Sequence, residues 1–125
     1  MAGRSGWGSL SAGELRAWAL VLEFDKRVAG YATFGPCRMR SVPPLGEIYE
    51  LYLRSEFQGI GFGKRLFVEA RRDLSENVFF GLLVWALADN DLACRFYTAL
   101  GGRERIRAHE RIGGIRLEKI GFVWH

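Results

Sequence analysis

The sequence predicts a mixed α/β domain, an α+β layered fold in which a mostly antiparallel sheet is flanked by helices. Apolar runs of strand length recur along the chain, and two helical segments separate the later runs. Short polar or glycine-containing turns join the first two runs and the last two, which is typical of hairpins. The predicted order in one sheet is therefore strand, strand, strand, helix, strand, helix, strand, strand.

Three strands are expected in the first half of the chain. Residues 17–24 and 28–34 are apolar and are separated by the polar turn Asp25-Lys26-Arg27, which predicts an antiparallel hairpin. A loop follows over residues 37–45, which contain two consecutive prolines. Aromatic and branched residues at 47–53 then favour a third strand.

Two helices and the remaining strands are expected in the second half. Apolar residues recur at steps of three and four from Phe62, which predicts a helix that ends at Asn77. The apolar run at 78–87 is typical of a strand buried on both faces. The capping side chain of Asn90 and the glycines after Leu100 delimit a second helix. The domain closes with a hairpin of two strands, 103–110 and 115–124.

Length and composition limit the class of protein. The 125 residues suffice for one domain, and 49% hydrophobic with 26% charged residues exclude a disordered or fibrous chain. We expect a loose, glycine- and serine-rich arm at residues 1–16 and a single domain at 17–125. The longest uncharged apolar stretch, 78–88, is shorter than the about 20 residues of a membrane-spanning helix, and the N-terminus lacks a signal-peptide core. A cytoplasmic protein without a membrane partner is therefore expected.

Charge and cysteines are less informative. A net charge of +4 leaves anionic ligands open, but the basic residues are dispersed, so no nucleic-acid partner is expected and a nucleic-acid-binding module is a minor alternative. Cys37 and Cys94 lack metal-binding spacing and are interpreted as packed free thiols, so no metal is expected. Alternation places the arginines of 103–107 and His109 on one strand face, which either binds an acidic substrate or is simply solvated.

A glycine-rich segment between the third strand and the first helix is the clearest chemical signal. Glycines let backbone amides approach a ligand closely, and a helix N-terminus favours anions. The segment is not a P-loop, because Gln58 and Arg65 replace its glycine and hydroxyl residue; Lys64 replaces the third glycine of a dinucleotide motif. A turn without a ligand is the alternative. The segment reads Gln58-Gly59-Ile60-Gly61-Phe62-Gly63-Lys64.

Two motifs resemble those of a known family. The spacing Gln58-x-x-Gly61-x-Gly63 is similar to the (Arg/Gln)-x-x-Gly-x-(Gly/Ala) motif of the GNAT superfamily of acyl-CoA-dependent N-acetyltransferases. Residues 90–101 resemble the family's Asn-x-x-Ala-x-x-Phe-Tyr-x-x-x-Gly segment. The resemblance extends from about Ala17 to the end of the sequence and implies a GNAT-like sheet.

The resemblance implies an enzyme that moves acetyl from acetyl-CoA, its co-substrate, to a primary amine. Acetyl-CoA would lie in a wedge between the third and fourth predicted strands, where amides of the glycine loop suit a diphosphate. The implied binding residues are Leu51, Tyr52 and Leu53 for the pantetheine arm and thioester, Gln58 to Lys64 for the pyrophosphate, Asn90 for pantetheine, and Tyr97 near the sulfur.

Direct attack in a ternary complex, which the resemblance implies, needs an acid and a base but no nucleophilic side chain. Tyr97 matches the family's general acid if its pKa is not far above the working pH; otherwise it is a packed aromatic or only binds CoA. Glu47 matches a family base and Glu50 is the second candidate, and alternation would place them on opposite strand faces. Trp85 stands where other members carry a glutamate, and water alone is the remaining base.

The beginning of the chain departs from the family. GNAT proteins usually open with a strand and one or two helices before the hairpin that starts here near Ala17, and those helices line the acceptor site. The site is therefore unusually open, or a second subunit completes it, or the chain is a truncated relative that is catalytically weakened and only binds acyl-CoA. Exposed apolar surface at the gap favours a homodimer. The sequence does not specify whether the acceptor is a small-molecule amine or a protein amine.

Overall fold

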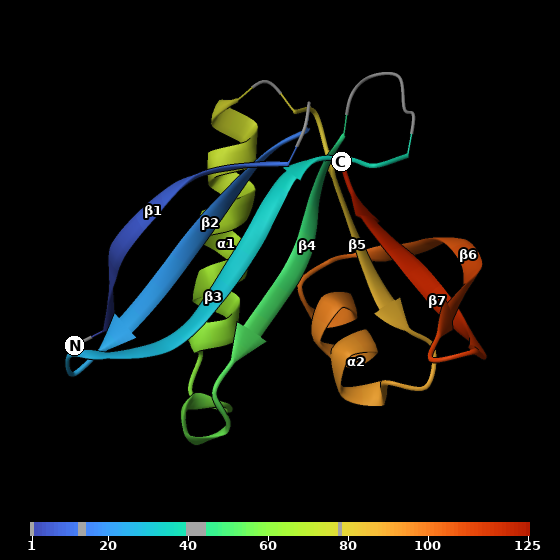
Figure 1. Ribbon diagram of the computed structural model, residues 1–125. Helices are drawn as coiled ribbons and strands as arrows, with labels where there is room; N and C mark the ends of the chain where they lie inside the picture. Colours follow the sequence, from blue (N-terminus) through green and yellow to red (C-terminus); the bar gives the residue numbers. More distant parts are fainter. Residues whose placement is uncertain (1, 13–14, 40–44, 78) are drawn as a thin grey trace.

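One sheet of seven strands carries two helices. The computed structural model describes residues 2–12, 15–39, 45–77 and 79–125. The strand order is β1-β2-β3-β4-β5-β7-β6, and all neighbours are antiparallel except β4 and β5 (Figure 1). The elements are β1 (Ala2–Ala12), β2 (Leu15–Phe24), β3 (Arg27–Pro36), β4 (Gly46–Leu53), the 3-10 helix η1 (Ser55–Phe57), α1 (Phe62–Glu76), β5 (Leu82–Leu87), α2 (Asp91–Ala99), β6 (Arg103–Ile112) and β7 (Ile115–Trp124).

Every element predicted from residue 17 onward is present, in the predicted order, so the predicted fold class is confirmed. The largest shift of a boundary is at β5, which begins at Leu82 rather than at 78. Residues before it are held by other contacts: the Phe79 amide donates to the Leu74 carbonyl (3.3 Å), and the Gly46 amide donates to the Gly81 carbonyl (2.9 Å). An apolar run can therefore be longer than the strand it contains.

The structure differs from the sequence prediction at the beginning of the chain. Residues 2–12 form β1, which pairs antiparallel with β2, whereas a loose arm and a missing opening strand were expected. No helix lies between β1 and β2 in the part of the chain that the structure describes. The glycine- and serine-rich composition gives no apolar alternation, so this strand is defined by its backbone pairing with the edge of β2.

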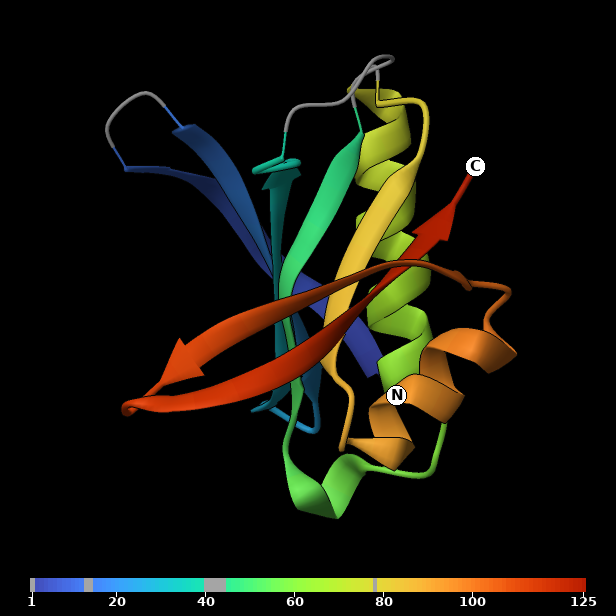
Figure 2. The same cartoon turned by 90° about the vertical axis from the view of Figure 1, so that its right-hand side faces the viewer.

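Both helices lie on one side of the sheet (Figure 2). α1 packs across β2, β3 and β4, and α2 contacts β5. The apolar spacing of α1 gives it one buried side, formed by Leu66, Phe67, Ala70 and Leu74. Burying each of the larger side chains contributes about 2 kcal/mol, so this packing fixes which side of the helix faces the sheet.

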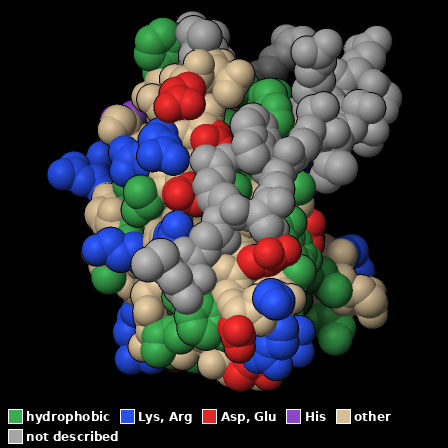
Figure 3. Space-filling view, turned by 90° about the vertical axis from the view of Figure 1, so that its left-hand side faces the viewer, with side chains coloured by type: hydrophobic (Ala, Val, Ile, Leu, Met, Phe, Trp, Pro, Cys, Tyr) green, Lys and Arg blue, Asp and Glu red, His purple; other side chains and the backbone are tan. Residues whose placement is uncertain are grey.

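Charged side chains of both signs occur on the face shown in Figure 3, with Lys and Arg mainly along one side and the lower rim and acidic residues between them. On this face the basic residues do not form the continuous stripe that is typical of nucleic-acid binding. Among the described residues, no helix combines the length and the apolar character needed to cross a membrane.

Candidate functional site

β4 and β5 pair only at their beginnings. The register joins Gly46 to Leu82, Glu47 to Leu83 and Ile48 to Val84, and ends there. Figure 1 shows the two strands diverging beyond this point, while β5 stays paired with β7 along its whole length. The backbone of Leu51–Leu53 therefore lies on a β4 edge that has lost its neighbour, where strand N–H and C=O groups can meet a ligand.

The glycine loop leads from this edge into α1. Gly59 and Gly61 have φ angles of 80° and 90°, which side chains rarely tolerate, so glycine is required there by the backbone. A Cβ atom at either position would meet nothing within 4 Å, so the outside of the loop is open. Gly61 is the N-cap of α1; no side chain caps this helix end, and no acidic residue lies in its first turn. Its first amides and Lys64 thus form a site that suits an anion.

Aromatic packing fixes the loop in place. Phe57 is buried against Phe24 and Phe62, with ring centroids 5.9 Å away in both cases. The Gln58 side-chain amide donates to the Leu53 carbonyl at 3.0 Å. Gln58, the first residue of the glycine motif, therefore ties the loop to the end of β4.

A β-bulge at Tyr49 interrupts the alternation of β4. In the β3–β4 register Thr33 pairs with Glu50 and Phe34 pairs with Ile48, so Tyr49 is the extra residue. The bulge lies one residue beyond the last β4–β5 pair. The position where β4 changes its pairing with β3 is thus also where it parts from β5.

The bulge corrects the predicted faces of the two glutamates. Beyond it, Leu51 and Leu53 pack against the helix-side core together with Ile48. Glu47 precedes Ile48 in regular strand and points the other way, and the bulge turns Glu50 to that same side. The expectation that Glu47 and Glu50 lie on opposite faces is therefore wrong, because one extra residue shifts the alternation.

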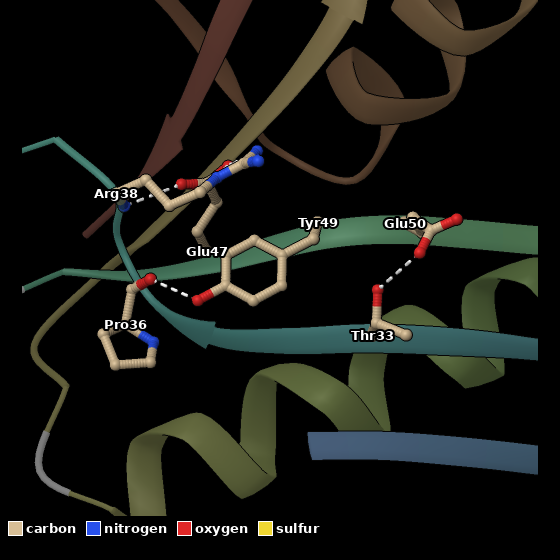
Figure 4. Close-up of polar contacts among 6 residues, drawn as sticks. All are labelled: Thr33, Pro36, Arg38, Glu47, Tyr49 and Glu50. Carbon is tan, nitrogen blue, oxygen red and sulfur yellow. Dashed lines mark hydrogen bonds and ion pairs between the residues drawn. The ribbon is translucent and has the colours of Figure 1, made fainter. Parts of the chain in front are cut away.

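Glu47 is held by Arg38. The Glu47 side chain is 1% exposed, and its Oε2 atom accepts from Arg38 Nη2 at 2.6 Å and Nε at 3.2 Å. Its Oε1 atom accepts from the Arg38 backbone amide at 3.0 Å. The Arg38 guanidinium also lies over the Tyr49 ring, whose hydroxyl donates to the Pro36 carbonyl (Figure 4). Burial raises the pKa of Tyr49 to about 12, and the Glu47 carboxylate adds to this rise.

Glu50 has neutral partners instead. Thr33 Oγ1 donates to its Oε1 atom at 3.3 Å (Figure 4), and the Tyr31 hydroxyl donates to its Oε2 atom at 3.3 Å. The negative charge of Glu50 is the main reason that the pKa of Tyr31 is raised. Tyr31 is also in ring contact with Tyr52, the residue that faces it in the register.

Tyr97 lies in an aromatic cluster between α1, α2 and β7. Its ring contacts Phe67 and Phe122, and Trp124 lies edge-on at 6.0 Å. Burial raises the pKa of its phenol to about 12. No hydrogen bond to its hydroxyl is found among the described residues. Trp124 Nε1 donates to the Leu100 carbonyl at 3.1 Å, which ties the end of α2 to β7.

Asn90 caps α2, as the sequence predicts. Its side-chain oxygen accepts from the Ala93 amide at 3.1 Å, which leaves its amide group as the donor for a ligand. Cys37 and Cys94 are free thiols, as expected, and burial raises the pKa of both. Within the described ranges, no group of three or more His, Cys, Asp or Glu residues could hold a metal ion.

The basic face predicted on β6 is not continuous. The β6–β7 register shifts between Glu104 and Ile106, so Arg105 falls at a bulge. Arg107 forms ion pairs with Glu118 at 2.6 Å and Glu104 at 3.5 Å. Neighbouring carboxylates thus neutralise part of this surface.

Comparisons with known proteins identify the family. The model of the FR47-like protein family matches residues 37–112. The chain belongs to this family. YuaI, an uncharacterized N-acetyltransferase of Bacillus subtilis, is 32% identical to this FR47-like protein over 97 residues, which are 78% of the chain and 56% of YuaI. The FR47-like chain therefore spans little more than half the length of this relative.

Solved structures confirm the GNAT fold that the sequence motifs predicted. A GNAT-family protein from Desulfovibrio desulfuricans superposes with a TM-score of 0.74 at 20% identity, covering 86% of this chain and 67% of that one. Arabidopsis thaliana NAA60, solved in complex with acetyl-CoA, superposes with a TM-score of 0.71 at 21% identity, covering 90% of this chain and 77% of that one.

The sequence analysis did not single out three residues that contact the two glutamates of β4, because no motif includes them. These residues are Tyr31, Thr33 and Arg38.

Proposed function

We propose that this FR47-like protein transfers acetyl from acetyl-CoA to a primary amine, by direct attack of the amine on the thioester. The observation that carries the proposal is the parting of β4 from β5 after Ile48 and Val84, directly beside an uncapped, glycine-rich helix start. A strand edge with unpaired backbone groups suits the amide-bearing pantetheine arm, and the helix start suits a diphosphate. The N-acetyltransferase name of YuaI supports the same activity.

The glycine loop would hold the diphosphate. Amides from Gly59 to Lys64 are near the positive end of the α1 dipole, and Lys64 adds a full charge. Gln58 orients the loop through its bond to Leu53. The backbone groups of Leu51, Tyr52 and Leu53 would bind the pantetheine arm and orient the thioester carbonyl, and the Asn90 amide would bind pantetheine from the start of α2.

Tyr97 would donate a hydrogen bond to the departing sulfur. A phenol with a pKa of about 12 is protonated at neutral pH, so it is a donor throughout. It is also a weaker acid than a thiol, whose ordinary pKa is about 8.5. Tyr97 therefore stabilises the thiolate by hydrogen bonding, and the sulfur takes its final proton from water. The unpartnered hydroxyl supports this role, because a ligand can supply its acceptor.

Glu47 would accept the proton of the attacking amine. A carboxylate offers about four acceptor positions, and Arg38 occupies three of those on Glu47. The remaining position can take the amine proton directly or through a water. As the N–C bond forms and the C–S bond breaks, the nitrogen loses one proton to Glu47 and the sulfur leaves as thiolate.

Thermal unfolding with acetyl-CoA is the first test, with ATP and NADH as controls. If acetyl-CoA is present at a hundred times its Kd, mass action stabilises the protein by about 2.7 kcal/mol, a shift of several degrees. The second test follows thiol release with a panel of primary amines. Stabilisation by acetyl-CoA without amine-dependent thiol release would favour the alternative, a weakened acyl-CoA-binding domain. No stabilisation would contradict both.

A homodimer remains part of the proposal. In the described part of the chain no helix lies between β1 and β2, where GNAT proteins have the helices that line the acceptor site. Sedimentation at several protein concentrations, with and without acetyl-CoA, would test it. A monomer that is fully active would show that the site is complete in one chain.

A further inference from the structure

Glu50 differs from the other strand carboxylate of this site in the chemistry of its partners. Glu47 is paired with an arginine, whereas Glu50 accepts only from the hydroxyls of Tyr31 and Thr33, both at 3.3 Å. No lysine or arginine of the described chain pairs with Glu50. In a protein with 18 basic and 14 acidic residues, this carboxylate keeps its charge on an exposed sheet face without a cation.

Two aromatic rings stand beside this charge. Tyr31 and Tyr52 are cross-strand partners, with ring centroids 5.5 Å apart and ring planes inclined by 34°. The Tyr52 side chain is 51% exposed. An aromatic face attracts a cation, and a carboxylate in contact with the same cation adds to the attraction. The three side chains of Tyr31, Glu50 and Tyr52 are called the tyrosine–glutamate patch below.

The patch is next to the proposed reaction site. Glu50 immediately precedes Leu51, the first residue of the β4 backbone assigned above to the thioester arm. The bulge at Tyr49 turns Glu50 to the same side as Glu47, the proposed base. At about 3.3 Å per strand residue, these two carboxylates are separated by roughly 10 Å along β4.

We propose that the tyrosine–glutamate patch binds a second, positively charged amino group of the acceptor, so that the preferred acceptors are aliphatic diamines. The attacking nitrogen must be neutral, and a carboxylate with aromatic rings favours the charged form of an amine. The patch is therefore suited to the distal nitrogen rather than to the reacting one. The distal ammonium at Glu50 positions the other nitrogen at the parted edge of β4. The inference that diamines are acceptors rests on the proposed acetyl transfer. Binding of a diamine to the tyrosine–glutamate patch is measured without that reaction.

Binding is measured by calorimetry with the protein saturated with CoA, so that no reaction occurs. Putrescine is compared with butylamine and hexamethylenediamine with hexylamine, because each pair differs by one amino group. We expect at least one diamine to bind about tenfold more tightly than its monoamine, since an exposed ion pair and a cation–π contact each contribute modestly. Equal binding within both pairs would overturn the inference.

Variants assign the effect to the patch. Glu50→Gln should reduce the diamine-to-monoamine affinity ratio to near one, and Tyr52→Leu should reduce it several-fold. Glu76→Gln, which removes a carboxylate from the last turn of α1, should leave the ratio unchanged. A diamine-to-monoamine affinity ratio that is unchanged by Glu50→Gln would overturn the assignment of diamine binding to the patch. A ratio that falls equally with Glu76→Gln would overturn it too. Diamine binding at the patch without thiol release from acetyl-CoA would contradict the proposed acetyl transfer and leave this inference intact.

Discussion

The two ends of β4 have different environments, and the bulge at Tyr49 separates them. Before the bulge the strand is paired on both sides, and Glu47 is buried with an arginine. After the bulge β5 has parted from it, and Glu50 and Tyr52 are exposed beside neutral hydroxyls. At the paired end the protein itself occupies most acceptor positions of the carboxylate, whereas the parted end leaves backbone and side-chain groups for a ligand. One inserted residue thus separates an end with a buried, ion-paired glutamate from an end with an exposed one.

Outside β4, the largest effect of any variant should come from Tyr97→Phe on α2. Turnover should fall about a hundredfold, because the hydrogen-bond donor proposed for the departing thiolate is lost. The melting temperature should change little, since the hydroxyl has no partner among the described residues. Steady-state kinetics and thermal unfolding measure the two effects. An unchanged turnover would remove Tyr97 from the mechanism.

At the paired end, Glu47→Gln should lower stability by about 2 kcal/mol, because Arg38 loses its charged partner. Turnover should also fall at least tenfold, since glutamine cannot accept a proton. Arg38→Gln is the matched variant: it should lower stability to a similar extent while retaining most of the turnover. Equal losses of turnover in the two variants would show that Glu47 acts only through structure.

Tyr97 should also make the free energy of unfolding fall at alkaline pH. Its folded pKa of about 12 lies above the ordinary value of 10, so the unfolded chain releases this proton first. The stability that this shift contributes is complete below pH 10 and is lost as the pH rises towards 12. The two pKa units correspond to a total loss of about 2.7 kcal/mol. Urea unfolding from pH 9 to 11 should show a decline that Tyr97→Phe reduces. The same slope in both proteins would assign the decline to other groups.

Two glycines of the loop should respond in opposite directions. Gly61→Ala places a side chain at a φ of 90° and should destabilise by about 1 kcal/mol, with weaker acetyl-CoA binding. Gly63 is helical, and a Cβ there would meet Phe96 at an ordinary 3.5 Å. Gly63→Ala should therefore stabilise by about 0.5 kcal/mol. Chemical denaturation of both variants measures this, and equal shifts would contradict the backbone argument.

The smallest effect on stability should come from Glu50→Gln. Its carboxylate is exposed and accepts only two long hydrogen bonds, so the free energy of unfolding should change by less than about 0.5 kcal/mol. Chemical denaturation of Glu50→Gln and Glu47→Gln side by side compares the stability contributions of the two ends of β4. A loss of unfolding free energy in Glu50→Gln as large as in Glu47→Gln would contradict the difference between the two ends.

Periodicity predicted the fold because most elements bury one continuous side. The spacing from Phe62 predicted α1, and the cap at Asn90 predicted α2. The opening strand was missed because its glycines and serines show no alternation, and it is defined by pairing with β2. Pairing with a neighbour's edge can define a strand, and composition does not record this.

The sequence offered candidate site residues but little of their geometry. The roles of the glycine loop, Glu47, Glu50 and Tyr97 stay predictions, and the loop lies at the start of α1 as expected. The bulge was not foreseen, because an extra residue at Tyr49 leaves the composition of the strand unchanged. Arg38 was not foreseen either, since it reaches Glu47 from the segment that follows β3.

The tie between Trp124 and the end of α2 has a consequence for the order of assembly. β2, β3 and β4 pair in sequence order and can form from local contacts as the chain is synthesised. The cluster around Tyr97 needs Phe122 and Trp124 of β7, the strand that pairs with β5. A chain still being synthesised could therefore hold a formed hairpin while the aromatic cluster around Tyr97 is incomplete. That cluster is complete only when β7 has left the ribosome.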